Sequence, residues 1–253
     1  MPPVPPLDLH TVILIAAAGL FAGTQNALAG GGSFITFPAL LLVGLNPLAA
    51  NMTSTIAMFP SQATSAIAGR KLVDDVGPLT FRQMFIISII GGIAGAILLR
   101  ITPPTFFERL VPWLVLFATS MFAWGAFRKQ PLHAASSMPR WALILTQGAI
   151  SIYGGYFGGG IGFLMLAALT IAGQQIRAAT ATKNVLAMAM NAAATAIFAF
   201  SSLISWPAAL ALCAGGIGGG LLGSWLIYRL PPRAMRIFVV CVGVALTVYM
   251  FWR

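Results

Sequence analysis

The chain repeats itself along its length, and this repeat constrains the fold more than any other feature of the sequence. When the sequence is shifted by 129 residues, many residues align with identical ones: Gly30-Gly31 with Gly159-Gly160, Phe34 with Phe163, Ala39-Leu40 with Ala168-Leu169, Gly44 with Gly173, Ala49-Ala50 with Ala178-Ala179, and Thr53 with Thr182. A shift of 128 residues aligns Gly91-Gly92 with Gly219-Gly220, Gly95 with Gly223, and Pro103-Pro104 with Pro231-Pro232. We therefore expect two structurally related halves, each with a short segment next to a glycine run.

The composition places both halves in a lipid bilayer. Of the 253 residues, 59% are hydrophobic and 7% are charged, whereas roughly a quarter of the residues of a soluble domain are charged. Ten apolar segments are predicted, at about 9–28, 33–45, 51–69, 80–100, 106–127, 140–157, 161–173, 178–203, 207–228 and 234–252. The second and seventh are shorter than the ~20 residues that cross a bilayer, so we expect broken or partly extended helices there. The predicted fold class is an all-α polytopic membrane protein.

The N-terminal segment and the cysteines suggest no processing and no cross-links. The first apolar segment follows a Pro-rich stretch without basic residues or a clear cleavage site, so we expect a retained helix rather than a signal peptide. Cys213 and Cys241 lie in separate apolar segments and form no C-x-x-C pair. Buried cysteines of this kind behave as small hydrophobic residues.

The basic residues test how many segments cross the membrane, because positively charged loops stay cytoplasmic. The net charge is +10. If all ten segments cross and the N-terminus is outside, eleven basic residues fall inside: Arg70, Lys71, Arg82, Arg128, Lys129, Arg140, Arg177, Lys183, Arg229, Arg233 and Arg236. Only Arg100, Arg109 and Arg253 then fall outside. If the two short segments are re-entrant, the split becomes seven against seven, so the charges favour ten crossings.

Ten crossings give five per half, and an odd number forces the two halves into opposite orientations. The sequence therefore predicts two inverted five-segment repeats, the arrangement of carriers that work by alternating access. We expect residues 1–127 to form the first transmembrane repeat and residues 140–253 the second. Residues 128–139 are the expected cytoplasmic linker, within the longest polar stretch of the chain.

Polar residues inside the apolar segments recur at equivalent places in the two halves. Thr55 and Gln62 are seven residues apart, and so are Asn184 and Asn191, so each pair projects from one helix face. The repeat shift places Thr55 on Asn184 and Gln62 on Asn191, and we expect the two faces to meet near the membrane midplane. Both helices are expected to begin at these Thr-rich stretches, where free backbone N–H groups carry partial positive charge. With the hydroxyls and Lys183, such groups suit an anion.

The candidate substrate-binding residues come from these two helices and from the glycine turns that precede the short segments. They are Gly31, Gly32, Asn51, Thr53, Ser54, Thr55, Gln62, Gly159, Gly160, Thr180, Thr182, Lys183, Asn184 and Asn191. A structural interpretation stays open beside this one. Ser, Thr and Asn also cap helices or join them, and glycine also permits close helix packing. A lysine near a helix start also extends to the cytoplasmic surface.

Several classes of protein are excluded by what the sequence lacks. Its four acidic residues, Asp8, Asp74, Asp75 and Glu108, lie at termini, loops or segment edges, whereas cation carriers and proton relays need buried carboxylates. No G-x-x-x-x-G-K-[ST] or H-E-x-x-H motif occurs, and neither histidine lies within the interior of an apolar segment, since His10 stands at the edge of the first one and His133 between two of them. We therefore expect no enzyme, no cofactor, no metal site and no nucleic-acid partner. The expected partners are a small anionic substrate and the lipid bilayer.

Two stretches resemble a known family of membrane proteins. Residues 30–42, GGGSFITFPALLL, and the helix start at Asn51–Thr55 resemble the first-repeat signature of the sulfite exporter TauE/SafE family. Residues 158–162, GGGIG, followed by Ala179–Asn184, resemble its second-repeat signature. The resemblance covers nearly the whole chain. It implies a multi-pass inner-membrane permease for small sulfur-containing anions such as sulfite, sulfoacetate or other organosulfonates.

Three functional hypotheses follow. The first is an anion carrier that exports its substrate by alternating access, because an inside-negative potential favours anion export by about 2.3 kcal/mol per charge per 100 mV. The second is ion-coupled uptake of an organosulfur or carboxylate compound. The third is a non-transporting membrane scaffold, in which changes at Thr182 or Asn191 alter stability alone. The substrate, its direction, the coupling ion and the oligomeric state stay open at this stage.

Overall fold

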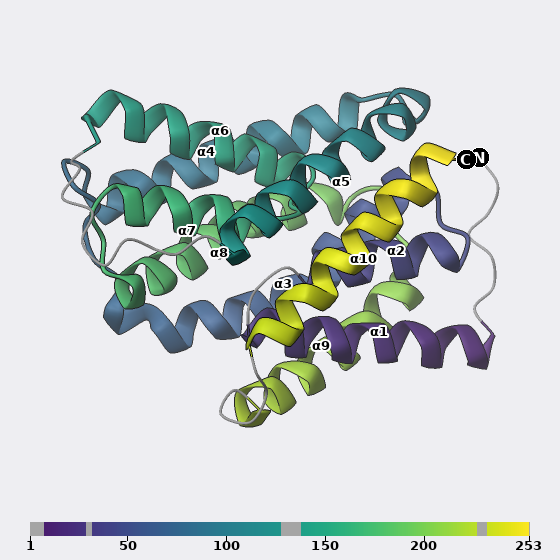
Figure 1. Ribbon diagram of the computed structural model, residues 1–253. Helices are drawn as coiled ribbons and strands as arrows, with labels where there is room; N and C mark the ends of the chain where they lie inside the picture. Colours follow the sequence, from purple (N-terminus) through teal and green to yellow (C-terminus); the bar gives the residue numbers. More distant parts are fainter. Residues whose placement is uncertain (1–7, 29–31, 128–137, 227–231, 253) are drawn as a thin grey trace.

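The computed structural model describes residues 8–28, 32–127, 138–226 and 232–252, and these residues form ten α-helices (Figure 1). The helices are α1 (Leu9–Leu28), α2 (Ser33–Leu42), α3 (Pro47–Gly69), α4 (Phe81–Ile101), α5 (Pro104–Phe127), α6 (Arg140–Tyr156), α7 (Ile161–Ile171), α8 (Ile176–Phe198), α9 (Trp206–Leu226) and α10 (Pro232–Trp252). A short 3-10 turn, η1 (Arg70–Leu72), follows α3. The prediction of an all-α chain with ten helical segments is confirmed.

Among the described residues, three helical spans are long and apolar enough to cross a membrane, namely Leu9–Asn26, Phe81–Ile101 and Pro104–Trp124. Shorter apolar helices cover Ser33–Leu42, Ile161–Ile171, Trp206–Leu222 and Val240–Trp252. Large apolar side chains such as Ile90, Trp113 and Leu210 lie exposed on the outside of the bundle, as expected where helices face lipid rather than water. These features describe a multi-pass membrane protein.

Two helix pairs pack with their backbones almost in contact, and glycine makes this possible. Along α1 and α9, a Cβ atom added to Gly215 would collide with the carbonyl oxygen of Ala16, and one added to Gly219 with that of Leu20. Along α4 and α6, a Cβ atom added to Gly95 would collide with the carbonyl oxygen of Ile152. Small residues are the usual means by which membrane helices approach closely. Since α1 precedes α9 by most of the chain, these glycines join distant parts of the sequence.

The centre of the bundle is formed by α3 and α8, which run antiparallel. Gly69, at the end of α3, lies against Ala181, near the start of α8. Each of these helices has 23 residues, yet neither is among the apolar spans, because polar residues run along both. Additional contacts join α3 to α9 and α4 to α8.

The two short segments are short helices. α2 has 10 residues and α7 has 11, lengths of about 15 and 17 Å at 1.5 Å per residue, so neither alone spans the ~30 Å hydrocarbon core. Each ends at a glycine with positive φ, 92° at Gly44 and 96° at Gly173. In both turns the next residue donates its N–H to the carbonyl five residues back, from Leu45 to Leu40 and from Gln174 to Leu169. This is the Schellman arrangement of a helix C-terminus.

The predicted start of the third helix at Asn51 is wrong. α3 begins at Pro47, after Asn46, whose side-chain oxygen accepts a hydrogen bond of 2.9 Å from the backbone N–H of Ala49. An Asn cap followed by Pro is a strong helix start, and the apolar pattern alone concealed it. α8 likewise begins at Ile176 and ends at Phe198, short of the predicted residue 203. Thr53–Thr55 and Thr182–Asn184 therefore lie inside helices rather than at their starts.

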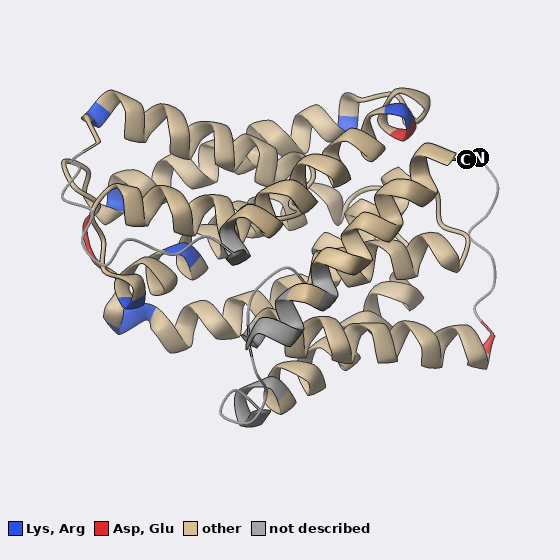
Figure 2. Ribbon diagram, in the orientation of Figure 1, with Lys and Arg blue, Asp and Glu red and all other residues tan. Residues whose placement is uncertain are grey.

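Basic residues gather at one end of the bundle. Figure 2 shows most of the Lys and Arg positions at the end where α6 begins, with fewer at the opposite end. Around the former end lie Arg70 and Lys71 of η1 and the first-turn residues Arg82, Arg140 and Arg177. At the opposite end, Arg100 closes α4, and Glu108 and Arg109 lie near the start of α5. Most of the described basic side chains outside the cavity therefore lie at the end of the bundle where α6 begins.

Candidate functional site

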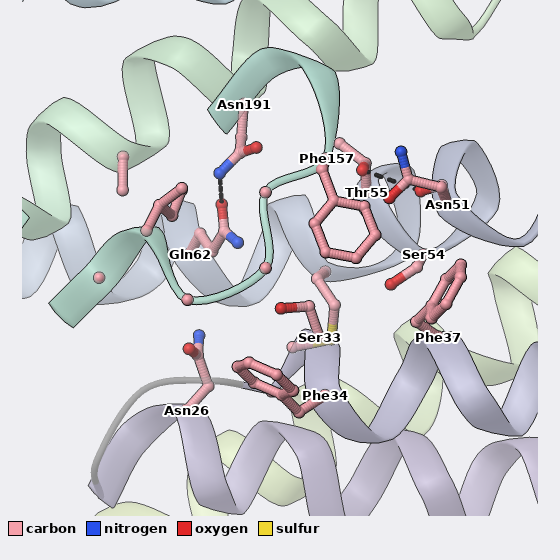
Figure 3. Close-up of a pocket in the computed structure, with 18 of the residues that line it drawn as sticks. Asn26, Ser33, Phe34, Phe37, Asn51, Ser54, Thr55, Gln62, Phe157 and Asn191 are labelled. Atoms are coloured by element: carbon pink, nitrogen blue, oxygen red, sulfur yellow. Dashed lines mark hydrogen bonds between the residues drawn. The ribbon is translucent and has the colours of Figure 1, made fainter. Parts of the chain in front are cut away.

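A polar cavity lies where α2, α3, α7 and α8 meet, with a volume of about 90 Å³ (Figure 3). Polar cavities need roughly 10–15 Å³ of such volume per water molecule, so this one has room for several waters or a small anion. Ten predicted site residues line it: Gly32, Asn51, Ser54, Thr55, Gln62, Gly159, Gly160, Lys183, Asn184 and Asn191. The residues that sequence analysis singled out in separate halves of the chain are thereby brought together.

The two polar helix faces meet at a direct hydrogen bond. The side-chain nitrogen of Asn191 donates to the side-chain oxygen of Gln62 over 2.8 Å, across a sequence separation of 129 residues (Figure 3). The predicted contact between the Gln62 and Asn191 faces is confirmed. The α8 residues that line the cavity, at positions 183, 184, 187 and 191, each lie 129 positions after an α3 residue that also lines it.

Lys183 is the one charged side chain among the described residues that line the cavity. It is partly buried, and a Cβ atom built on Gly162 would lie 3.7 Å from its Nζ, which places the ammonium group beside the first turn of α7. The cavity contains no carboxylate to neutralise this charge, because the four acidic side chains of the chain are exposed at helix ends and loops. A lysine at the centre of a membrane helix costs about 3 kcal/mol on insertion scales.

The helix N-termini that open onto the cavity belong to α2 and α7, rather than to α3 and α8 as predicted. Gly32 and Gly160 are the residues that precede these helices, both line the cavity, and neither has a side chain to cap the helix. The first backbone N–H groups of a helix have no partner within it, and they carry partial positive charge. Two such termini and one ammonium group make the cavity electropositive.

The second glycine turn is held in a conformation that requires glycine. Gly158 and Gly160 have φ of 77° and 75°, a left-handed region that costs other residues roughly 1–2 kcal/mol. The hydroxyl of Tyr153 donates to the carbonyl oxygen of Gly159 over 2.8 Å and fixes the turn. The equivalent turn of the first half contains Gly31, which lies outside the described residues.

Three predicted site residues lie away from the cavity. Thr53 is fully buried, and its hydroxyl oxygen accepts a hydrogen bond of 3.3 Å from the backbone N–H of Ser205. Thr182 is also fully buried, and its hydroxyl oxygen accepts one of 3.3 Å from the side chain of Gln174. The hydroxyl of Thr180 donates to the carbonyl of Ile176 in its own helix over 2.8 Å. Thr53 and Thr182 thus link their helices to neighbouring loops, whereas Thr180 bonds only within α8.

The aromatic wall of the cavity was not predicted. Phe34 and Phe37 of α2 and Phe157 of the second turn line it, and the rings of Phe37 and Phe157 meet edge to face at 5.7 Å (Figure 3). Asn26 and Ser33 add polar groups from the first half. The spacing of Phe34 and Phe37, three residues apart next to a glycine run, is the sequence signal that indicates their shared face.

The contact between Gln62 and Asn191 is expected to stabilise the fold modestly. Hydrogen bonds between membrane helices couple by about 0.6 kcal/mol on average, so Gln62→Ala and Asn191→Ala should each destabilise the protein. The double variant should be less destabilised than the sum of the single variants by about that amount. The free energy of unfolding in mixed micelles measures this coupling. Strictly additive single effects would show that the two amides do not interact in the folded protein.

The structure therefore defines a class: an all-helical, multi-pass membrane protein with an electropositive cavity enclosed by helices from both halves of the chain. Comparison with known proteins then gives the family. Residues 15–250 match the family described as "Sulfite exporter TauE/SafE", and the chain belongs to this family.

Curated relatives align with this chain over nearly its whole length. The chain is 29% identical over 246 residues to the "Probable membrane transporter protein ORF9" of Sinorhizobium sp., covering 96% of this chain and 93% of that protein. It is 27% identical over 253 residues to a "Probable membrane transporter protein" of Haemophilus influenzae, covering 97% and 96%. It is 26% identical over 252 residues to the "Probable membrane transporter protein YfcA" of Escherichia coli, covering 96% and 90%. The relatives are named as transporters rather than enzymes.

Proposed function

We propose that this protein is a secondary transporter that moves small sulfur-containing anions, such as sulfite, sulfoacetate or organosulfonates, out of the cell across the cytoplasmic membrane. The observation that carries the proposal is the cavity between the two halves, in which Lys183 is the one charged lining residue described and no carboxylate is present. Membership of the TauE/SafE family and the transporter names of the relatives support it.

The chemistry of the cavity suits an oxyanion. Lys183 supplies a full positive charge, and the starts of α2 and α7 supply backbone N–H groups. Ser33 adds a hydroxyl donor and Asn184 an amide donor. A sulfite or sulfonate group presents three oxygens, so it accepts hydrogen bonds from several of these donors at once. The apolar rings of Phe34 and Phe37 suit the carbon chain of a sulfonate.

We further infer that the two halves are inverted repeats of five helices, with residues 1–127 and 140–253 joined by a cytoplasmic linker at 128–139. The helix contacts support this, because each contact has a counterpart in which every helix is replaced by the one five places away in the chain. The contact of α1 with α9 corresponds to that of α6 with α4, α3 with α9 to α8 with α4, and α2 with α3 to α7 with α8. The matching Schellman turns at Gly44 and Gly173 support it as well. A residue in contact with its own repeat partner, as Gln62 is with Asn191, lies on the axis of two-fold symmetry that such repeats imply.

Alternating access then assigns a role to the central helices. α3 and α8 would tilt against each other at the cavity, so that the site opens to one side of the membrane at a time. The single-sided distribution of basic residues supports an orientation with η1 and the start of α6 in the cytoplasm. The negative interior of a cell then drives an anion outward without a coupled proton, in keeping with a cavity that lacks carboxylates.

The test is sulfite efflux from proteoliposomes that contain the purified wild-type protein, at potentials set by potassium gradients and valinomycin. We expect radiolabelled sulfite to leave fastest when the potential drives anions outward, and unlabelled sulfoacetate to compete. Protein-free liposomes are the control. If neither sulfite nor sulfoacetate moves faster than in the control, the proposed substrate class is wrong. Transport that requires a sodium or proton gradient would favour coupled uptake instead.

A further inference from the structure

A second hollow lies on the described surface between α4 and α8, and it shares no residue with the polar cavity. It is a groove of about 650 Å³. Its wall on α4 is formed by Ile89, Ile93 and Ile97, which recur every four residues along one helix face. Its wall on α8 includes alanines such as Ala193 and Ala196. The groove therefore runs along two adjacent helices of the bundle.

The groove exists because α4 and α8 approach closely at Gly92 and carry side chains of very different size next to that contact. At Gly92 the backbones meet, since an added Cβ atom would lie 2.7 Å from the Cα atom of Met190. Beyond this contact the alanines of α8 are too small to fill the space next to the isoleucines of α4. Ile93 and Ile97 are 38% and 47% exposed. In a bilayer an apolar groove of this kind is filled by hydrocarbon rather than water.

Arg100 closes one end of the groove and is the charged residue among those described that line it. It is exposed, in the last turn of α4. From Ile89 to Arg100 the helix rises about 16 Å, close to the ~15 Å depth of hydrocarbon in one leaflet. The apolar walls thus extend as deep as an acyl chain, and the guanidinium group lies at the level of lipid headgroups.

We propose that this groove binds an anionic phospholipid, with one acyl chain between α4 and α8 and the phosphate hydrogen-bonded to Arg100. A guanidinium group donates two parallel hydrogen bonds to a phosphate and binds it more strongly than a neutral donor does. One phospholipid molecule supplies both the apolar chain and the negative charge that the groove requires. This lipid site is separate from the transport site, so the test of lipid binding does not depend on which substrate the protein transports.

The test is native mass spectrometry of the full-length protein, titrated with phosphatidylglycerol or phosphatidylcholine carrying the same acyl chains. We expect wild type to retain phosphatidylglycerol preferentially. Arg100→Gln should lower its retention roughly tenfold, in line with the loss of a charge-assisted hydrogen bond. The loss should be smaller for phosphatidylcholine, because its choline ammonium already offsets the phosphate charge. Ala193→Trp fills the groove and should reduce retention of both lipids.

Two matched controls distinguish this site from the general lipid surface. Arg109→Gln removes another exposed charge at the same end of the bundle, and Ala94→Trp enlarges an exposed residue of α4 outside the groove. Both should behave as wild type. Equal retention of the two lipids by wild type, or equal effects of Arg100→Gln and Arg109→Gln, would overturn the proposal. A protein dimer that disappears in Ala193→Trp would also overturn it, because a second copy would then occupy the groove.

Discussion

Replacement of Lys183 with Gln is expected to reduce sulfite flux in proteoliposomes at least about tenfold, the loss that accompanies one hydrogen bond to a charged group. The change removes the single charge among the described residues that line the cavity. Gln keeps a hydrogen-bond donor on a side chain of similar length, so the loss of flux measures the contribution of the positive charge. Because no carboxylate lines the cavity, no other group is left with an unpaired charge when the lysine is lost.

Two variants serve as controls for Lys183→Gln. Lys183→Arg keeps the charge beside the first turn of α7 and should retain part of the flux. Lys71→Gln removes an exposed lysine of η1 that does not line the cavity, and should transport sulfite as wild type does. If Lys183→Gln also transports at the wild-type rate while the wild type is active, the anion is bound elsewhere.

Alanine substitutions at two adjacent glycines of α9 are expected to have opposite effects on stability. A Cβ atom at Gly219 would collide with the backbone carbonyl of Leu20, whereas one at Gly220 meets nothing within 4 Å. Gly219→Ala should therefore separate α1 from α9 and destabilise the protein by about 3 kcal/mol, the upper part of the usual range for overpacking. Gly220→Ala should be neutral or stabilising by up to about 1 kcal/mol, because alanine favours the helix.

The thermal stability of both α9 variants is measured as the melting temperature in detergent, from the fraction of folded protein that size-exclusion chromatography detects after heating. The pair Gly95→Ala and Gly148→Ala repeats the comparison where α4 packs on α6. Gly95 faces the backbone of Ile152, and Gly148 has open space. Similar melting temperatures for Gly219→Ala and Gly220→Ala would mean that α1 and α9 are not packed as closely as in this structure.

The helical fold could be predicted well from the sequence. Apolar segments mark membrane helices because the bilayer requires each to be long and apolar, and all ten predicted segments are helical. The ends of the helices were less predictable. Asn46 and Pro47 start α3 four residues before the apolar pattern does, because helix ends are determined by local capping rather than by hydropathy.

The site was predicted in part, and helix geometry explains the difference. The seven-residue spacing of Thr55 and Gln62 identifies one face of α3, and the structure places that face on the cavity. Thr53 precedes Thr55 by two residues, about 200° around the helix, so it faces the loop at Ser205 instead. Thr182 and Asn184 differ in the same way in α8. Sequence analysis selected both threonines for their hydroxyl groups without regard to direction.

The sequence by itself determined that this chain is a helical membrane protein with a polar face on each of two helices, because hydropathy and helical periodicity act locally. Only the tertiary structure decided which helices meet. It brings α1 onto α9 and α4 onto α6 through glycines far apart in the chain, and it points the starts of α2 and α7 at the cavity beside Lys183. These contacts depend on the packing of distant helices, which no local pattern in the sequence encodes.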